Sequence, residues 1–181
     1  QALLRYHHKL GSAVLGRQRI NLDNQRFIGS VAWRQNEQTF DGALTQLKPI
    51  DGLTLSYAYL DQVNTVFGPD NGRYDNLTNQ ANIDGHSHLI NAQYVFMPQL
   101  TATAYSYLLD LDNIAVAPTA AEGTLSSQTS GLRLNGVIAG FSYALEYAQQ
   151  KDYGDNPLEL DSEYYLTELG YTLKGVQLKA G

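Results

Sequence analysis

The chain has 181 residues, of which 43% are hydrophobic and 17% charged, and its formal net charge is -6 at pH 7. This negative balance argues against a nucleic-acid partner, because binding to phosphates needs a basic surface that displaces counterions. Cysteine is absent, which excludes disulfides and thiolate metal sites. A helical membrane protein is excluded as well, because each span needs about 20 consecutive apolar residues and the apolar runs of this chain are only a few residues long.

Segments of alternating polarity recur along the chain and predict β-strands. In chain order they cover about residues 12–20, 37–47, 53–61, 88–97, 100–110, 126–136, 141–150 and 165–173, and residues 175–181 begin one more. The alternation is clearest at 141–150, where large apolar residues alternate with small or polar ones. Segment 100–110 has apolar residues on both faces, so the pattern does not orient it.

The connections between these strands are alternately short and long. Short ones fall at 48–52, 97–99, 136–140 and 173–176, and long polar ones at 21–36, 68–84, 112–125 and 151–158. If successive strands are antiparallel, all short turns lie at one end of the sheet and all long loops at the other. This asymmetry is typical of an outer-membrane β-barrel.

We therefore predict an all-β fold, an antiparallel transmembrane β-barrel of which about eight to nine strands are visible. Residues 1–181 are expected to form a single barrel segment, incomplete at both ends and belonging to a larger barrel. The excess of 13 Tyr over 5 Phe and 1 Trp suits aromatic girdles at a membrane boundary. A soluble β-sandwich or lipocalin-like barrel is the alternative; it explains the alternation equally well, but not the long loops at one end.

Four short motifs stand near the first long loop. They are Gly-Arg-Gln at 16–18, Arg-Phe-Ile-Gly at 26–29, Trp-Arg-Gln-Asn at 33–36 and Phe-Asp-Gly at 40–42. This stretch resembles the region around an early outer loop of alginate-export-type outer-membrane porins. The resemblance implies a large monomeric barrel in the bacterial outer membrane, an arginine-lined lumen, and passage of a solute, which in the founding member is an anionic polysaccharide.

Eight residues are candidates for a pore-lining solute track. Arg17 and Arg19 share a strand face, and Arg133 lies on the polar face of its strand. The full set is Arg17, Arg19, Arg26, Arg34, Arg133, and the carboxylates Asp41, Glu146 and Glu168, which are available to pair with the arginines. Arginine suits such a track because its charge is permanent and its donors form a planar fork. We also expect Phe27 and Trp33 to pack the loop at 21–36, which contains Arg26 and Arg34, against the wall or the interface at a constriction.

We predict an outer-membrane porin for passive diffusion of small hydrophilic or anionic solutes, in contact with outer-membrane lipid and monomeric. The alternative is a dedicated exporter of an anionic polysaccharide such as alginate. An enzyme is not expected, because neither Gly-x-Ser-x-Gly nor a phosphate-binding Gly-rich motif is present. A barrel-embedded enzyme or an adhesive barrel are further alternatives.

No cofactor is expected. Calcium at residues 70–76 or 110–113 is the one possibility left open, although Asp, Asn and Gly there are typical of solvated turns. His7, His8, His86 and His88 form two near pairs, but neither has an evident third ligand, so no metal site is predicted.

Overall fold

The computed structural model describes residues 2–68, 80–112, 125–173 and 176–181. Within these ranges, ten strands form one antiparallel sheet in sequence order. They are β1 (Leu3–His8), β2 (Gly11–Gln18), β3 (Thr39–Leu47), β4 (Leu53–Asn64), β5 (Asn82–Met97), β6 (Leu100–Leu109), β7 (Ser127–Ile138), β8 (Phe141–Asp152), β9 (Asp161–Leu173) and β10 (Val176–Ala180). No helix in the described part of the chain has the length and hydropathy needed to cross a membrane.

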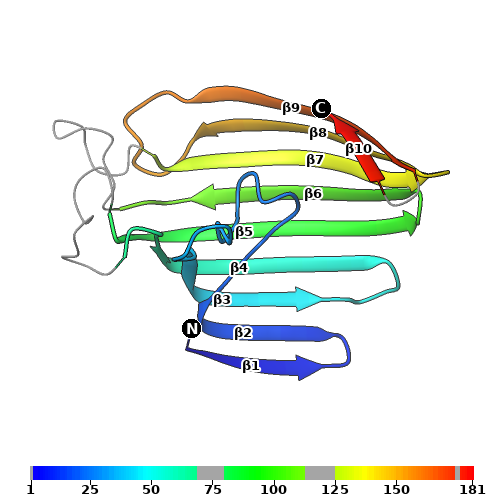
Figure 1. Ribbon diagram of the computed structural model, residues 1–181. Coiled ribbons are helices and arrows are strands. Elements are labelled where there is room, and N and C mark those ends of the chain that lie inside the picture. Colours follow the sequence, from blue (N-terminus) through cyan, green and yellow to red (C-terminus); the bar gives the residue numbers. More distant parts are fainter. Residues whose placement is uncertain (1, 69–79, 113–124, 174–175) are drawn as a thin grey trace.

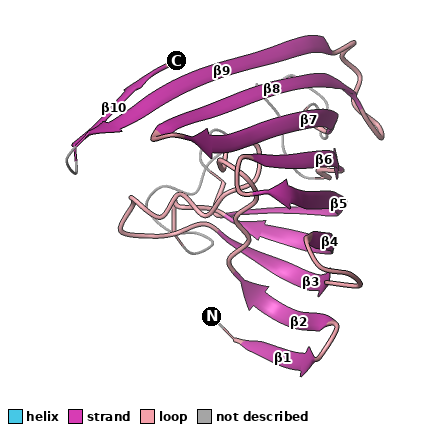
Figure 2. Ribbon diagram, turned by 90° about the vertical axis from the view of Figure 1, so that its right-hand side faces the viewer, coloured by secondary structure: helices cyan, strands magenta, loops and turns pink. Residues whose placement is uncertain are grey.

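The sheet is curved into an open trough (Figures 1 and 2), with β1 at one edge and β10 at the other. Every strand pairs with its sequence neighbour through an antiparallel ladder, as in an up-and-down barrel wall. This architecture confirms the predicted all-β class and its antiparallel barrel arrangement, as part of a larger barrel.

The two ends of the sheet differ as predicted. At one end, which we call the short-turn end, successive strands are separated by two to five residues, as at 9–10, 48–52, 98–99 and 139–140. At the other, the long-loop end, the connections are 19–38, 65–81, 110–126 and 153–160 (Figure 1). Several predicted segments lie wholly or partly outside the described residues. They are residues 174–175 of the turn predicted at 173–176, much of the loops predicted at 68–84 and 112–125, the possible calcium segment at 70–76, and residue 113 of the one at 110–113.

One of the two-residue hairpins shows how local sequence joins neighbouring strands. Ala139 and Gly140 alone join β7 to β8, with φ values of 50° and 85°. Positive φ at both central residues is the geometry whose twist matches that of the flanking strands. Glycine adopts this conformation without steric cost, whereas Ala139 is held there by the twelve-pair ladder between β7 and β8.

The alternation in sequence separates two faces of the sheet. On β8, Leu145 is 44% exposed, whereas Ala144 and Glu146 are each 5% exposed. The buried residues lie on the concave face, and the exposed apolar residues lie on the convex face. The structure also orients β6, which the pattern left open: Thr103, Tyr105 and Tyr107 are buried on the concave side.

The convex face has the character of a lipid-facing surface. Apolar residues such as Leu132, Leu145 and Leu169 form its middle band. Aromatic pairs lie toward both strand ends: Phe141 and Tyr171 have ring centroids 4.4 Å apart near the short turns, and Tyr147 and Tyr165 lie 5.0 Å apart nearer the long loops. Rings at both boundaries of an apolar band form the girdles of an outer-membrane barrel.

The structure has ten strands where the sequence predicts about eight to nine. Strand β1 is not predicted, because its sequence Leu-Leu-Arg-Tyr-His-His places apolar and polar residues in blocks rather than in alternation. Pairing with β2 from Leu3–Gly16 to His8–Gly11 holds this segment extended. Strand β5 also begins six residues earlier than predicted, at Asn82 rather than His88, because its ladder with β4 continues past a bulge at Leu60 and Gln62.

Adjacent residues of β7 provide a test of the two faces. Leu134 faces the convex side and pairs with Leu145, whereas Asn135 faces the concave side. We expect Leu134→Lys to lower the free energy of unfolding in lipid vesicles by about 2–4 kcal/mol, the penalty for a charge near the bilayer midplane. Asn135→Lys should change it by less than about 1 kcal/mol. Equal losses in urea titrations of the two variants would contradict the assignment of faces.

Candidate functional site

The connection between β2 and β3, residues 19–38, folds over the concave face instead of extending beyond the strand ends. We call it the inner loop. In Figure 1 it rises from β2 across β3 to β6, and in Figure 2 it lies within the trough. Ile20 and Ile28 of this loop are 1% and 4% exposed and pack against Phe40, Leu60 and Leu89 of the wall. The part of the concave face beneath the loop is therefore buried rather than exposed in the lumen.

The inner loop has a defined backbone conformation. Asp23, Gln25 and Val31 have φ values of 51°, 60° and 53°, in the left-handed region that a β-branched residue such as Val rarely enters. Hydrogen bonds within the loop hold these turns, including Leu22 N to Ile28 O at 3.1 Å and Ser30 N to the Asn21 side chain at 2.7 Å. Such strained positions persist only when surrounding contacts determine them.

Asp23 is the first of two polar anchors of the loop. Its Oδ2 accepts hydrogen bonds from the Tyr107 hydroxyl and from Asn91 Nδ2, each at 2.9 Å. Burial raises the pKa of the Asp23 carboxyl above its ordinary value, and the nearby Glu146 charge acts in the same direction. The hydrogen bonds from Tyr107 and Asn91 oppose this change, because they stabilise the ionised form.

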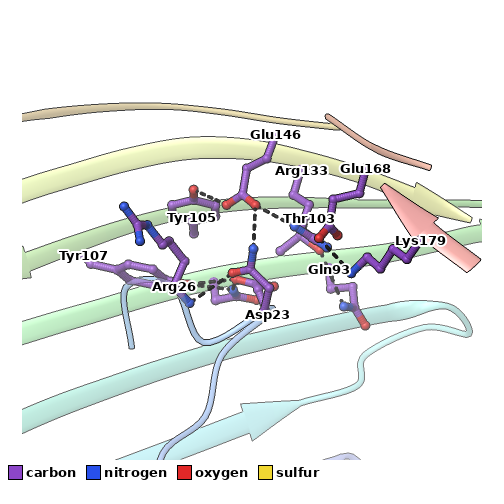
Figure 3. Close-up of polar contacts among 12 residues, drawn as sticks. Asp23, Arg26, Gln93, Thr103, Tyr105, Tyr107, Arg133, Glu146, Glu168 and Lys179 are labelled. Atoms are coloured by element: carbon purple, nitrogen blue, oxygen red, sulfur yellow. Dashed lines mark hydrogen bonds and ion pairs between the residues drawn. The ribbon is translucent and has the colours of Figure 1, made fainter. Parts of the chain in front are cut away.

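Glu146 of β8 is the second anchor, and its carboxylate is shared by three donors (Figure 3). Arg133 Nη1 lies 2.6 Å from Oε2, the Tyr105 hydroxyl 2.7 Å from Oε1, and Asn24 Nδ2 of the loop 3.2 Å from Oε2. The side chains of Arg133 and Glu146 are only 12% and 1% exposed. We call these residues the docking cluster. It consists of Asp23 and Asn24 of the inner loop and of their partners Asn91, Tyr105, Tyr107, Arg133 and Glu146.

Gly131 is a residue that sequence analysis missed. It lies on β7 opposite Tyr105 of β6, and a Cβ added there would stand 2.5 Å from the Tyr105 ring and hydroxyl. The absence of a side chain thus lets Tyr105 lie flat on β7 with its hydroxyl directed at Glu146. No local signal marks this glycine, because the close approach comes from the neighbouring strand.

Two arginines of the inner loop lie over aromatic rings. The Arg26 guanidinium is 5.1 Å from the Tyr164 ring centroid, and that of Arg34 is 4.5 Å from the Trp33 ring. Phe27 contacts Tyr105 and Tyr164 with ring centroids 5.9 and 5.5 Å apart, which agrees with its expected packing role. Trp33 is 78% exposed, so of its two expected positions, the wall or the interface, it does not take the one against the wall.

The remaining candidates lie elsewhere. Arg17 shares the convex side of β2 with Leu15 and pairs with Asp41 at 2.6 Å. Arg19 lies beyond the end of β2 and pairs with Glu37 at 3.0 Å. This corrects the expectation that Arg17 and Asp41 line the lumen: period-two spacing shows that residues share a face, but not which solvent that face meets.

Glu168 does lie on the concave face, but its partner is Lys179 of β10, with Nζ 2.7 Å from Oε1 (Figure 3). Arg133 and Glu146 are therefore the one predicted pair that the fold brings together on this face among the described residues. His86 and His88 share the convex face, where their Nδ1 atoms bond the hydroxyls of Tyr59 and Tyr57 at 2.7 and 2.8 Å. Within the described ranges, no group of three His, Asp or Glu side chains is arranged to hold a metal.

A curved antiparallel sheet with an apolar, aromatic-bounded convex face and a loop docked on its concave face defines part of an outer-membrane β-barrel. The family model for alginate export matches residues 1–180, and the chain belongs to this family of outer-membrane porins. Its place is the bacterial outer membrane. No curated protein matches the chain.

Solved structures share this fold at low sequence identity. OccK3 (OpdO) of Pseudomonas aeruginosa superposes with a TM-score of 0.70 at 19% identity, covering 95% of this chain and 43% of its own. OpdL of the same organism has a TM-score of 0.64 at 20% identity, covering 99% of this chain and 48% of OpdL. OccAB2 of Acinetobacter baumannii has a TM-score of 0.63 at 21% identity, covering 91% of this chain and 40% of OccAB2. The chain thus spans less than half the length of each structure.

Because Glu146 holds the docking cluster together, its loss should destabilise the protein. Glu146→Ala leaves Arg133 buried without its partner and should lower the free energy of unfolding by about 3–5 kcal/mol. Glu146→Gln keeps an acceptor for Tyr105 and Asn24, so it should lower the free energy of unfolding less than Glu146→Ala does. Urea unfolding of the full-length protein in vesicles measures both.

Glu163 offers a matched control, because it also accepts two tyrosine hydroxyls, at 3.0 and 2.9 Å, but both contacts are exposed. Glu163→Gln should change the free energy of unfolding by less than about 0.5 kcal/mol. A Glu146→Ala variant as stable as the Glu163→Gln variant would show that the docking cluster does not hold the loop.

Proposed function

We propose that the protein is an outer-membrane channel for passive diffusion of small hydrophilic solutes, with a preference for anions, and that this chain forms one segment of a single monomeric barrel. The observation that carries the proposal is the inner loop fixed on the concave face by the docking cluster. A loop held inside a barrel narrows the aqueous path without closing it. The transport involves no catalytic step and no cofactor.

Pairing of the charges supports the anion preference. On the concave wall, Arg133 and Lys179 each lie within 2.7 Å of a carboxylate oxygen. Arg26 and Arg34 of the inner loop have no ion pair with a carboxylate among the described residues, and lie over rings instead. The constriction thus keeps two positive charges that the wall does not neutralise.

Stacking on an aromatic ring suits an arginine that must contact passing solutes. The ring face attracts the guanidinium and fixes its plane, while the N–H donors at its edge remain free for a carboxylate or another anion. Because such contacts are exposed to water, each binds weakly and releases quickly, as conduction requires. We therefore assign the solute track to Arg26 and Arg34, with Arg133 and Glu168 on the adjoining wall and Glu146 buried behind it as the partner of Arg133.

A dedicated exporter of an anionic polysaccharide is the second candidate. It is favoured by the family to which the chain belongs, whose model is that for alginate export. An extended polyanion would need a series of cations along its path. Two arginines on one loop, without an ion pair in the described ranges, provide the start of such a series in this segment.

Single-channel recording of the full-length protein in a planar bilayer tests both functions. We expect discrete current steps from wild-type protein, since a fixed loop leaves a permanent aqueous path. Blockade by uronate oligomers but not by neutral oligomers of equal length would favour the exporter. Absence of discrete steps from folded protein would refute the channel.

Arg26 and Arg34 should set the ion selectivity. A unit charge about 4 Å from an ion in water changes its energy by about 1 kcal/mol, so replacing both by Gln should lower the anion-to-cation permeability ratio roughly two- to fivefold. The reversal potential in a salt gradient measures this ratio. Arg17→Gln is the matched control, because it removes an arginine from the convex face, and it should leave the reversal potential unchanged. Equal behaviour of control and double variant would remove the loop arginines from the track.

A further inference from the structure

A polar hollow of about 360 Å³ lies on the concave face at the short-turn end, away from the inner loop. It is formed by the starts and ends of β6 to β10, and its lining includes Arg133, Glu168 and Lys179, which Figure 3 shows beside the docking cluster. Its volume is at the lower end of the roughly 300–1,000 Å³ typical of small-molecule sites. One ring-sized solute unit fits such a space.

The hollow has cations, but they are already neutralised. Arg133 Nη1 lies 2.6 Å from Glu146, and Lys179 Nζ lies 2.7 Å from Glu168. An anionic solute would have to compete with these carboxylates, and a cationic solute with the two cations. The fixed charges therefore favour a solute without net charge at this position.

Neutral polar side chains of the hollow are free to bind a solute. Thr101, Asn135, Ser142 and Gln177 line it, and within the described part of the chain no side-chain hydrogen bond engages any of them. Amides and hydroxyls offer both donors and acceptors, the combination that matches sugar hydroxyls. Charged groups alone would not provide it.

Small residues form the floor of the hollow. Gly170 lies beside Ser142, and a Cβ added at Gly170 would stand 2.5 Å from the Ser142 hydroxyl oxygen. Ala144, adjacent in the same lining, is only 5% exposed. The space thus depends on Gly170 and Ala144, which present almost no side-chain volume at this height.

We propose that this hollow binds one ring of a neutral polyhydroxylated solute, a saccharide, at the short-turn end of the lumen. The inference deepens the proposed channel function and rests on it, because solute reaches the hollow through the lumen. It differs from the loop site in ligand chemistry: the hollow selects hydroxyl groups, whereas the loop arginines select charge.

The test uses full-length protein in detergent and a neutral glucose trisaccharide as the probe, with binding followed by saturation-transfer NMR. Wild-type protein should bind the trisaccharide. Asn135→Ala combined with Gln177→Ala should weaken binding about fivefold to tenfold, the effect of losing two hydrogen bonds. Gln177→Ala alone, at an exposed position, keeps the test valid if the double variant folds poorly, and should weaken binding about threefold.

Gln46 and Gln93 provide the matched control, since they are polar side chains of the concave face outside the hollow, bonded to Ser56 and Thr103. Replacing both by Ala should leave trisaccharide binding unchanged. A wild-type protein that conducts ions but does not bind the trisaccharide, or a control that loses binding equally, would overturn the inference while leaving the channel intact. Specific binding without conductance would instead support the hollow and refute the channel.

Discussion

The shared carboxylate of Glu146 is the interaction on which the arrangement of the concave face depends. A carboxylate that is 1% exposed needs several donors to offset its lost hydration. Arg133 from β7, Tyr105 from β6 and Asn24 from the inner loop supply them. Because these donors come from three separate segments, satisfying one buried charge also fixes the loop against the wall.

Docking of the loop divides the concave face into two regions. Toward the long-loop end, Ile20 and Ile28 fill the space and make it apolar. Toward the short-turn end the surface stays polar and hollow. The same contacts determine which charges act on a solute, since Arg133 is held by the docking cluster whereas Arg26 and Arg34 stay outside it.

The convex face is under a different constraint: polar groups near lipid must have partners within the protein. Arg17 pairs with Asp41 across β2 and β3, and Tyr59 bonds His86 across β4 and β5. Each pair lies toward the long-loop end of its strands, near the boundary of the apolar band. Polar residues are thus tolerated on this face where they are paired with one another.

The sequence alone determined most of the strands, their antiparallel order and the two different ends, because period-two polarity and turn residues are local properties; it missed β1, whose polarity does not alternate. It also marked the loop between β2 and β3 as the family-specific element. The tertiary structure decided which strand face carries each arginine, and that Glu146, Asn24 and Tyr105 meet, with Gly131 making room for the tyrosine ring. These contacts join residues up to 122 positions apart, and no local pattern encodes them, because they depend on sheet curvature and on the path of the loop across it.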